Sequence, residues 1–198
     1  MAEQPRSRAA AEEKLVRAAG ELLSEVGPRA TTVRAVAARA GVNHGLVHHY
    51  FGNKDGLLRA AMVRLVGDHA EFARRMAGGG PMPAPFALLQ DQKYLRAVMR
   101  CVLDGEMGLA TTELSEGVSV PRQAMDDLAA KRGLDGPDAQ LRAAMGIGMA
   151  IEMGWAALEP FIFAVTGVAP DEAGDARAEA VRVRNSFAAL QLAAVDRG

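Results

Sequence analysis

The feature that most constrains the fold is the stretch 31–58, TTVRAVAARAGVNHGLVHHYFGNKDGLL. Thr32 is a predicted N-cap, because its hydroxyl can accept a hydrogen bond from a free amide of an opening helical turn. Apolar residues then recur at helical spacing, at Val33, Val36, Ala37 and Ala40. Gly41 is predicted to end this helix, because glycine enters the left-handed conformation without a Cβ clash. The stretch therefore begins with a short helix that stops at a glycine turn.

A second short helix follows, with Asn43 as its predicted cap. Its apolar residues are predicted to face inward, which leaves a polar outer face made of His44, Gly45, His48, His49 and Tyr50. Asn53 is the predicted cap of a long third helix that begins at Lys54. Two helices joined by a glycine turn, the second with a polar outer face, are typical of the helix-turn-helix, which places its second helix in a DNA major groove.

Four motifs in this region resemble the TetR family of bacterial repressors. They are T-x-x-x-V-A at 32–37, A-G-V-N at 40–43, H-H-Y-F-G-N-K at 48–54 and L-L at 57–58. The resemblance covers roughly residues 10–65, and the caps, the glycine, the aromatic pair and the lysine all fall at the family's spacing. It implies an all-α protein, with an N-terminal three-helix DNA-binding unit followed by a helical ligand-binding and dimerisation domain.

The resemblance also assigns DNA-contact roles to a set of residues: Thr32, Arg34, Asn43, His44, Gly45, His48, His49, Tyr50 and Lys54. The family commonly has tyrosine where this chain has His48. Lys54 looks like the family's phosphate-binding lysine, and Arg34 is placed to touch backbone or base. Two other interpretations of the histidines are a solvated helix face and a metal site at His44 and His48. The sequence offers no further ligands beside them, so no metal is predicted.

Charge supports an anionic partner for the N-terminal part of the chain. Residues 1–60 hold nine Lys/Arg against six Asp/Glu (+3), whereas the remaining 138 residues hold 14 against 18 (−4). Arg6 and Arg8 lie ahead of the expected DNA-binding unit, where they would reach phosphate or the minor groove, or form a solvated tail. The excess of positive charge is modest and does not by itself establish DNA binding.

Composition predicts a folded soluble protein, with 49% hydrophobic and 24% charged residues. The single cysteine, Cys101, excludes an intramolecular disulfide and suits the cytoplasm. The residues after Met1 lack the apolar run of a signal peptide. The apolar stretch 143–165 is long enough to raise the question of a transmembrane helix, but Glu152, Glu159 and Pro160 favour a buried helix of a soluble protein.

Helical periodicity continues through the rest of the chain, and no strand is predicted. The predicted domains are residues 1–60, which bind DNA, and 61–198, which bind a ligand and dimerise. The connector Gly78–Pro85 is the clearest loop in the sequence. The long helix from Lys54 is expected to link the two domains.

The C-terminal part is rich in soft apolar side chains, which suit an adaptable ligand cavity or an ordinary core. The residues predicted to contact a ligand are Met99, Met107, Met125, Met149, Glu152, Met153, Trp155 and Phe163. If it is buried, the Glu152 carboxylate needs a partner, which could be a ligand or an arginine across a dimer interface.

Two further surfaces suggest a homodimer. Gly146, Ala150 and Gly154 form a smooth strip that allows close approach of another helix, either within the chain or from a second copy. The last helix has an apolar stripe at Ala180, Val183, Phe187 and Leu190. We expect both surfaces to form an isologous four-helix interface.

The sequence therefore predicts a ligand-responsive DNA-binding repressor without a cofactor. It lacks the P-loop, G-x-S-x-G, H-E-x-x-H and dinucleotide-binding motifs of common enzyme classes. The alternatives are an effector-less DNA-binding dimer, an activator, and an enzyme on an all-helical scaffold.

Overall fold

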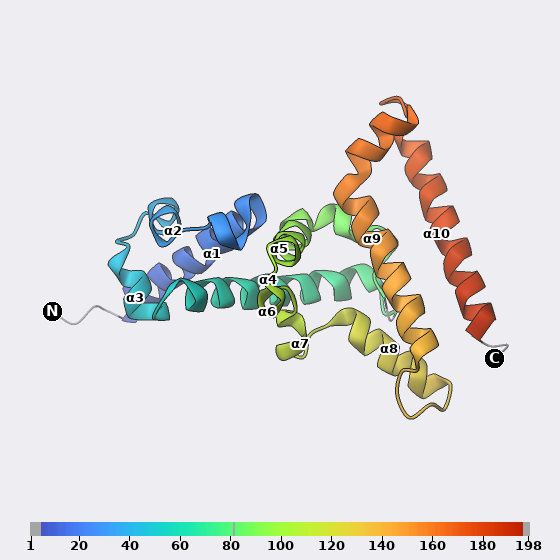
Figure 1. Ribbon diagram of the computed structural model, residues 1–198, viewed down its shortest axis with the longest axis horizontal. Coiled ribbons are helices and arrows are strands. Elements are labelled where there is room, and N and C mark those ends of the chain that lie inside the picture. The colour runs from blue at the N-terminus through green and yellow to red at the C-terminus, as the bar shows by residue number, and fades with distance from the viewer. Residues whose placement is uncertain (1–4, 81, 196–198) are drawn as a thin grey trace. The chain divides into compact units, whose positions relative to one another are not determined.

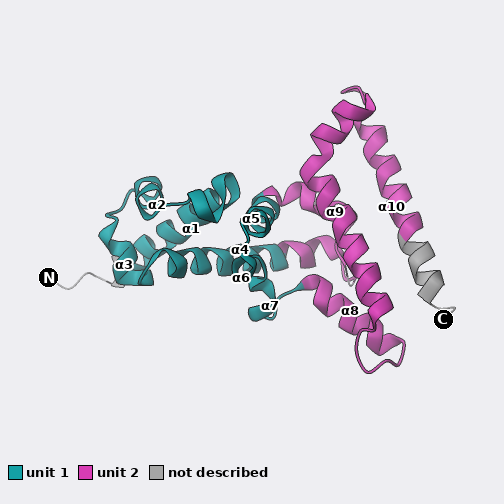
Figure 2. Cartoon of the chain, viewed as in Figure 1, with its two compact units in different colours: residues 1–71, 93–119 teal, residues 72–92, 120–198 magenta. Residues whose placement is uncertain are grey.

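A computed structural model of the chain describes residues 5–80 and 82–195, with side chains described for 8–80 and 82–187. Every regular element in these ranges is a helix, which confirms the predicted all-α class (Figure 1). The chain divides into two compact units, which interleave along the sequence (Figure 2).

Unit 1 comprises the chain up to Glu71 together with Lys93–Ser119. Its helices are α1 (Pro5–Ala30), α2 (Val33–Ala40), α3 (Gly45–Phe51), most of α4 (Lys54–Ala77), nearly all of α5 (Gln92–Leu103), α6 (Met107–Ala110) and α7 (Thr112–Ser115). Its core holds side chains that are almost fully buried: Leu15, Leu23, Val36, Val47, Leu57, Met62 and Leu95. Each contributes about 1.5–3 kcal/mol through removal from water.

Unit 2 comprises Phe72–Gln92 and the chain from Val120 onward. Its elements are η1, a 3-10 turn (Ala87–Gln90), and the helices α8 (Val120–Lys131), α9 (Ala139–Thr166) and α10 (Ala173–Val195). The loop before η1 lies where the sequence predicted the connector. It ends at Phe86, which has a left-handed backbone (φ 58°). The Phe86 amide donates to Glu152 Oε2 at 2.6 Å, so α9 holds this turn.

Two ion pairs join α9 and α10, which run antiparallel. Arg184 Nε lies 2.7 Å from Glu152 Oε1, and Arg177 Nη2 lies 2.6 Å from Glu159 Oε1. The partner of Glu152 is therefore an arginine of α10 in the same chain, and the expected arginine across a dimer interface is not needed. Both Glu side chains are well shielded, at 15% and 7% exposed.

The predicted burial of the long apolar helix is wrong for the chain taken alone. α9 is apolar and continuous as expected, but only 11% of its most apolar 18-residue window is buried. Phe161 and Val165 are 64% and 68% exposed. By length and composition this helix resembles a membrane span. Helices that other protein surface covers in soluble proteins have the same length and composition. The apolar sequence indicated that the helix needs a cover, and the described residues of α8, α10 and η1 cover only part of it.

The predicted domain boundary at residues 60/61 falls inside α4, which continues to Ala77. The division between the compact units instead falls after Glu71 and groups 93–119 with the N-terminal helices. The placement of the functional domains at 1–60 and 61–198 stays a prediction.

Candidate nucleic-acid interface

Local capping builds the helix pair at the N-terminal end. Thr32 Oγ1 accepts from the Ala35 amide at 3.1 Å, which starts α2 as predicted. Gly41 ends α2 with φ 67°, and the following Val42 amide donates to Ala37 O at 3.1 Å. The left-handed residue and its hydrogen bonds form the turn between the helices, at a position where glycine is the residue best tolerated.

Asn43 and Asn53 delimit the second helix. Asn43 Oδ1 accepts from the Gly45 amide at 2.8 Å, and Asn53 Oδ1 accepts from the Gly56 amide at 2.8 Å. Both side chains therefore accept from a backbone amide at a helix start as predicted, although the N-cap position of α3 falls on His44, which already has helical backbone angles (φ −61°, ψ −26°). Val47 is the fully buried anchor of α3.

The outer face of α3 presents the predicted polar residues to solvent. His44, Gly45, His48 and His49 are exposed and Tyr50 is half-buried. His48 Nδ1 lies 3.0 Å from Gly52 O, and because a carbonyl oxygen only accepts, Nδ1 is the donor in this contact. His49 and Tyr50 have ring centroids 5.1 Å apart. This face therefore holds hydrogen-bonding side chains on a rigid helix, as reading of base edges requires.

Arg8 lies beside this face rather than ahead of it. Its guanidinium carbon is 5.3 Å from the Tyr50 ring centroid, and its Nε donates to Glu12 Oε1 at 2.8 Å. The expectation for Arg6 concerns a side chain outside the described residues. The cation–π contact links the start of α1 to α3 and keeps positive charge next to the polar face.

Lys54 and Arg34 occupy different surroundings. Arg34 is exposed on α2. Lys54 Nζ donates to Arg29 O at 3.4 Å, in a cleft of about 280 Å³ also lined by Asp55 and Glu106. Arg39, by contrast, pairs with Glu25 of α1 at 2.7 Å and so helps to join α1 and α2.

Gly56 has a structural role at the junction of α3 and α4 that the sequence pattern did not reveal. A Cβ at this position would lie 2.2 Å from Phe51 O, so only glycine lets α4 begin directly behind α3. The signal in the sequence was a glycine in the first turn of a helix, where glycine otherwise weakens the helix.

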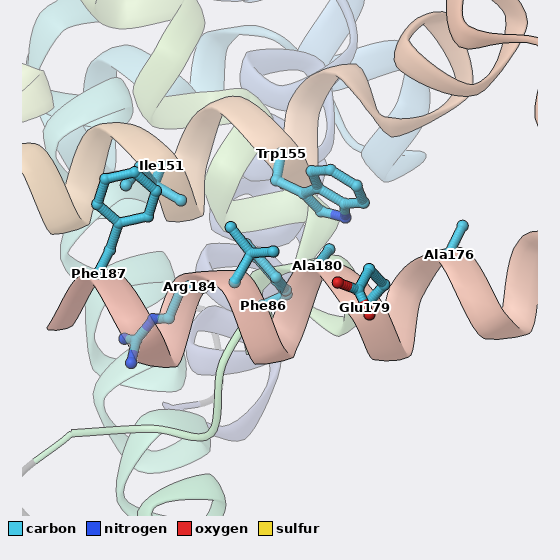
Figure 3. A pocket seen from close by; sticks show the side chains of 9 residues that line it. Phe86, Ile151, Trp155, Ala176, Glu179, Ala180, Arg184 and Phe187 are labelled. Atoms are coloured by element: carbon cyan, nitrogen blue, oxygen red, sulfur yellow. The ribbon is translucent and has the colours of Figure 1, made fainter. Parts of the chain in front are cut away.

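Most of the predicted ligand residues do not gather at one site. An open groove of about 420 Å³ runs between α9 and α10, lined by Phe86, Ile151, Trp155, Ala176, Glu179, Ala180, Val183, Arg184 and Phe187 (Figure 3). Trp155 is the one predicted residue in this lining, and Glu152 holds Arg184 beside it. Phe163 packs edge-on against Trp155, with centroids 6.0 Å apart.

The predicted methionines are spread over both units. Met99 and Met107 belong to unit 1, whereas Met125, Met149 and Met153 belong to unit 2. Met107 and Met149 are 52% and 36% exposed. A ligand role for the methionines stays a prediction.

Comparisons with known proteins agree with the geometry of the N-terminal helices. Residues 15–61 match the family model described as bacterial regulatory proteins, tetR family. The HTH-type transcriptional repressor Rv3405c of Mycobacterium tuberculosis (strain ATCC 25618 / H37Rv) is 30% identical over 154 residues, which are 78% of this chain and 76% of that protein. The HTH-type transcriptional regulator BetI of Stenotrophomonas maltophilia (strain R551-3) is 38% identical over 94 residues, 47% of this chain and 42% of that protein.

The fold is also shared with solved structures. A tetR-family transcriptional regulator from Streptomyces coelicolor superposes with a TM-score of 0.60 at 18% identity, covering 96% of this chain and 84% of that one. A putative TetR-family regulator from Rhodococcus sp. gives 0.57 at 16% identity, covering 90% and 98%. The chain therefore belongs to the TetR family and is a DNA-binding transcriptional regulator with an N-terminal helix-turn-helix.

Proposed function

We propose that this regulator is a cytoplasmic, homodimeric repressor that reads a near-palindromic operator with α3 and leaves it when a small molecule binds. The observation that carries the DNA-reading part is the exposed His44–His49 face, which capped turns hold on both sides. His44 and His49 contact base edges, and Gly45 lets the helix backbone approach the groove. Lys54 and Arg34 contact phosphates, with Thr32, Asn43, His48 and Tyr50 at the margin of the interface.

Lys54 has two competing roles in this proposal. In the free protein its ammonium group rests against the Arg29 carbonyl at 3.4 Å, a long hydrogen bond. A phosphate oxygen is a stronger acceptor for an ammonium group than a neutral carbonyl, because both partners are then charged. DNA therefore draws Lys54 away from Arg29.

A second copy of the chain supplies the missing cover of α9. Among the described residues, a Cβ built on Gly146 or Gly154 would meet no neighbouring element within 4 Å, so both glycines of the smooth strip have open space beside them. On α10, Val183 and Phe187 are 47% and 53% exposed, while the Leu190 side chain lies outside the described residues. These faces support an isologous interface, since each copy needs the same apolar area covered.

The effector is an apolar or amphipathic molecule. The wall of the groove between α9 and α10 is almost entirely apolar, with Trp155 and Phe86 stacked at 5.2 Å and Arg184 at its edge. A mostly apolar groove with few charged side chains in its lining, here Glu179 and Arg184, is typical of sites for amphipathic ligands. Binding of the effector would lower the affinity for the operator, and the reverse, because each favours a different state of the same dimer.

Operator selection tests the first part. Duplexes selected from a randomised pool by the full-length protein should share a two-fold sequence with half-site centres about 10 bp, or a multiple of that, apart. Recovery of DNA without a common motif would contradict base reading by α3. The second part is tested by titrating a library of small apolar acids, amines and neutral compounds into the complex with the selected DNA.

The rival proposal is a DNA-binding dimer without an effector. In that case the α9–α10 groove is filled by the partner, and no compound changes the affinity for DNA. A structure of the dimer separates the two proposals, because only the ligand-responsive protein retains a cavity. An enzymatic role would require turnover in the absence of DNA.

A further inference from the structure

A break in α1 lies directly ahead of the helix-turn-helix. Gly27 has φ 82° and ψ 172°, which divides α1 and leaves Pro28–Ala30 as a separate last turn. We call Gly27–Arg29 the Gly27 turn. Thr31, which is 1% exposed, donates from Oγ1 to Gly27 O at 2.7 Å and from its amide to the same oxygen at 3.2 Å. Because α2 begins at Val33, the Gly27 turn sets the direction in which the helix-turn-helix starts.

Two side chains from a part of unit 1 that is distant in sequence form hydrogen bonds to the backbone on both sides of this turn. Arg100, in the last turn of α5, donates from Nε to Ser24 O at 3.1 Å. Asp104, just after α5, accepts at Oδ2 from the Arg29 amide at 3.1 Å. Pro28 has no amide hydrogen, so the Ser24 carbonyl lacks its usual helical donor and Arg100 supplies one, while Asp104 accepts from the Arg29 amide after the break.

The approach of both side chains to Gly27 is close enough to favour glycine. A Cβ on Gly27 would lie 3.0 Å from Asp104 Oδ2 and 3.3 Å from Arg100 Cβ, and the positive φ independently disfavours any other residue. Glycine at this position therefore serves two needs at once, the break in the helix and the contact with Arg100 and Asp104. A surface contact without a role in the turn would not need the helix break and the close approach at the same residue.

We infer that Arg100 and Asp104 are positioning residues for DNA binding, which lock the Gly27 turn and thereby fix how α2 and α3 are presented to the operator. Neither residue lies on the α3 face that reads DNA. The inference rests on the DNA-binding function that the family establishes, and it holds whichever residues of α3 read bases. It makes the segment 93–119 a direct mechanical partner of the helix-turn-helix.

Because Asp104 is negatively charged, its positioning role predicts a change in DNA affinity opposite to the change that electrostatics alone predicts. DNA is a polyanion, so removing a carboxylate from the protein strengthens binding if charge is all that matters. If Asp104 locks the turn, removing its acceptor weakens binding despite the loss of negative charge. Asp104→Asn keeps an acceptor oxygen and loses the charge, whereas Asp104→Leu loses both at similar size.

The experiment measures the affinity of the full-length variants for a duplex that the unaltered protein has selected from a random pool, at several salt concentrations. Asp104→Asn should bind within about twofold of the unaltered protein, and Asp104→Leu should bind about five- to tenfold more weakly, because the Arg29 amide is then left without its acceptor. The salt dependence should not change, because no group that neutralises a phosphate is removed. Arg100→Met should weaken binding similarly. The double variant should lose less than the product of the two single losses, because both residues act on one turn.

Matched controls come from the same segment. Glu106→Leu removes a carboxylate two residues from Asp104 that, in the described part of the chain, forms no hydrogen bond with α1. Arg96→Met removes an exposed arginine one helical turn before Arg100. Neither should weaken DNA binding by more than about twofold, within the range of surface substitutions. Amide hydrogen exchange at Arg29 and Thr31 should accelerate in Asp104→Leu and not in Glu106→Leu.

The inference is overturned if Asp104→Leu binds as tightly as the unaltered protein or more tightly. It is also overturned if its loss equals that of Glu106→Leu. A general loss of stability is tested by thermal unfolding. If Asp104→Leu unfolds at a lower temperature but binds DNA normally where it is fully folded, the contact only stabilises the fold.

Discussion

Arg177 donates to Glu159 through two nitrogens, with Nη2 at 2.6 Å and Nε at 3.0 Å from the same carboxylate oxygen. The Trp155 indole donates to the other oxygen at 3.0 Å. The hydrogen bonds from Arg177, assisted by that from Trp155, lower the pKa of Glu159 although its burial acts in the opposite direction. The carboxylate is thus charged in the folded chain and has three donors.

Acid should therefore weaken the folded state through Glu159. A carboxylate whose pKa is lower in the folded chain stabilises it at pH values above the unfolded pKa of about 4.3, and this contribution is lost as the pH falls through the lower, folded pKa. We expect Arg177→Met to reduce the free energy of unfolding at pH 7, because the Glu159 carboxylate stays buried with one donor.

Chemical denaturation at pH 7 and at pH 3 checks this expectation, and the difference between the two proteins should shrink at pH 3. Arg182→Met is the matched control, because Arg182 and Glu179 form an exposed pair on the same helix. Its effect should stay below about 1 kcal/mol at both pH values. An equal effect of the two substitutions would show that the buried carboxylate has no special role.

Two glycines of α4 should respond in opposite ways to alanine. Gly56→Ala places a Cβ 2.2 Å from Phe51 O and should destabilise unit 1 by about 1–3 kcal/mol. Gly67→Ala meets no described atom within 4 Å and should stabilise the helix by about 0.5–1 kcal/mol. Thermal unfolding of both variants measures the difference. Stabilisation by Gly56→Ala would mean that the junction of α3 and α4 adjusts without cost.

Lys54 and His49 should separate affinity from sequence preference. Lys54→Ala should weaken binding to selected and random DNA alike and flatten the log–log salt dependence by about one unit for each phosphate that a subunit no longer neutralises. His49→Ala should cost about 1–3 kcal/mol per half-site on the selected DNA and little on random DNA. Titrations on both duplexes at several salt concentrations distinguish these outcomes. An equal loss for His49→Ala on both duplexes would remove His49 from base reading.

Phe187 tests the proposed dimer. Phe187→Asp places a carboxylate on an apolar face that is 53% exposed in the single chain, so it should dissociate the dimer and weaken operator binding together. Sedimentation at micromolar concentration measures the assembly. A monomeric unaltered protein at that concentration would contradict the proposal.

The sequence predicted the local features of the site well because their causes are local. The caps at Thr32, Asn43 and Asn53 and the turn at Gly41 depend on residues within four positions, and all four appear where the pattern placed them. The polar face of α3 follows in the same way from helical spacing.

Partners separated by many residues could not be predicted in this way. Arg100 binds a carbonyl 76 positions away, and the Glu152 carboxylate holds an amide 66 positions away. Tertiary packing brings such partners together, and the local spacing of side chains does not reveal which distant residues will meet. The exposure of α9 escaped prediction for a related reason, because composition shows that a helix is apolar but not which surface covers it.

The two ion pairs between α9 and α10 have a consequence for how this hairpin tolerates changes in length. Glu152 and Glu159 are seven residues apart on one helix, and their partners Arg184 and Arg177 are seven apart on the other. Inserting one residue between Arg177 and Arg184 would rotate one arginine by about 100° relative to the other, because each residue advances the helix by 1/3.6 of a turn. An insertion in the connection 167–172 leaves both spacings intact. Length variation among relatives should therefore collect in that connection, while the two paired helical segments keep a constant number of residues.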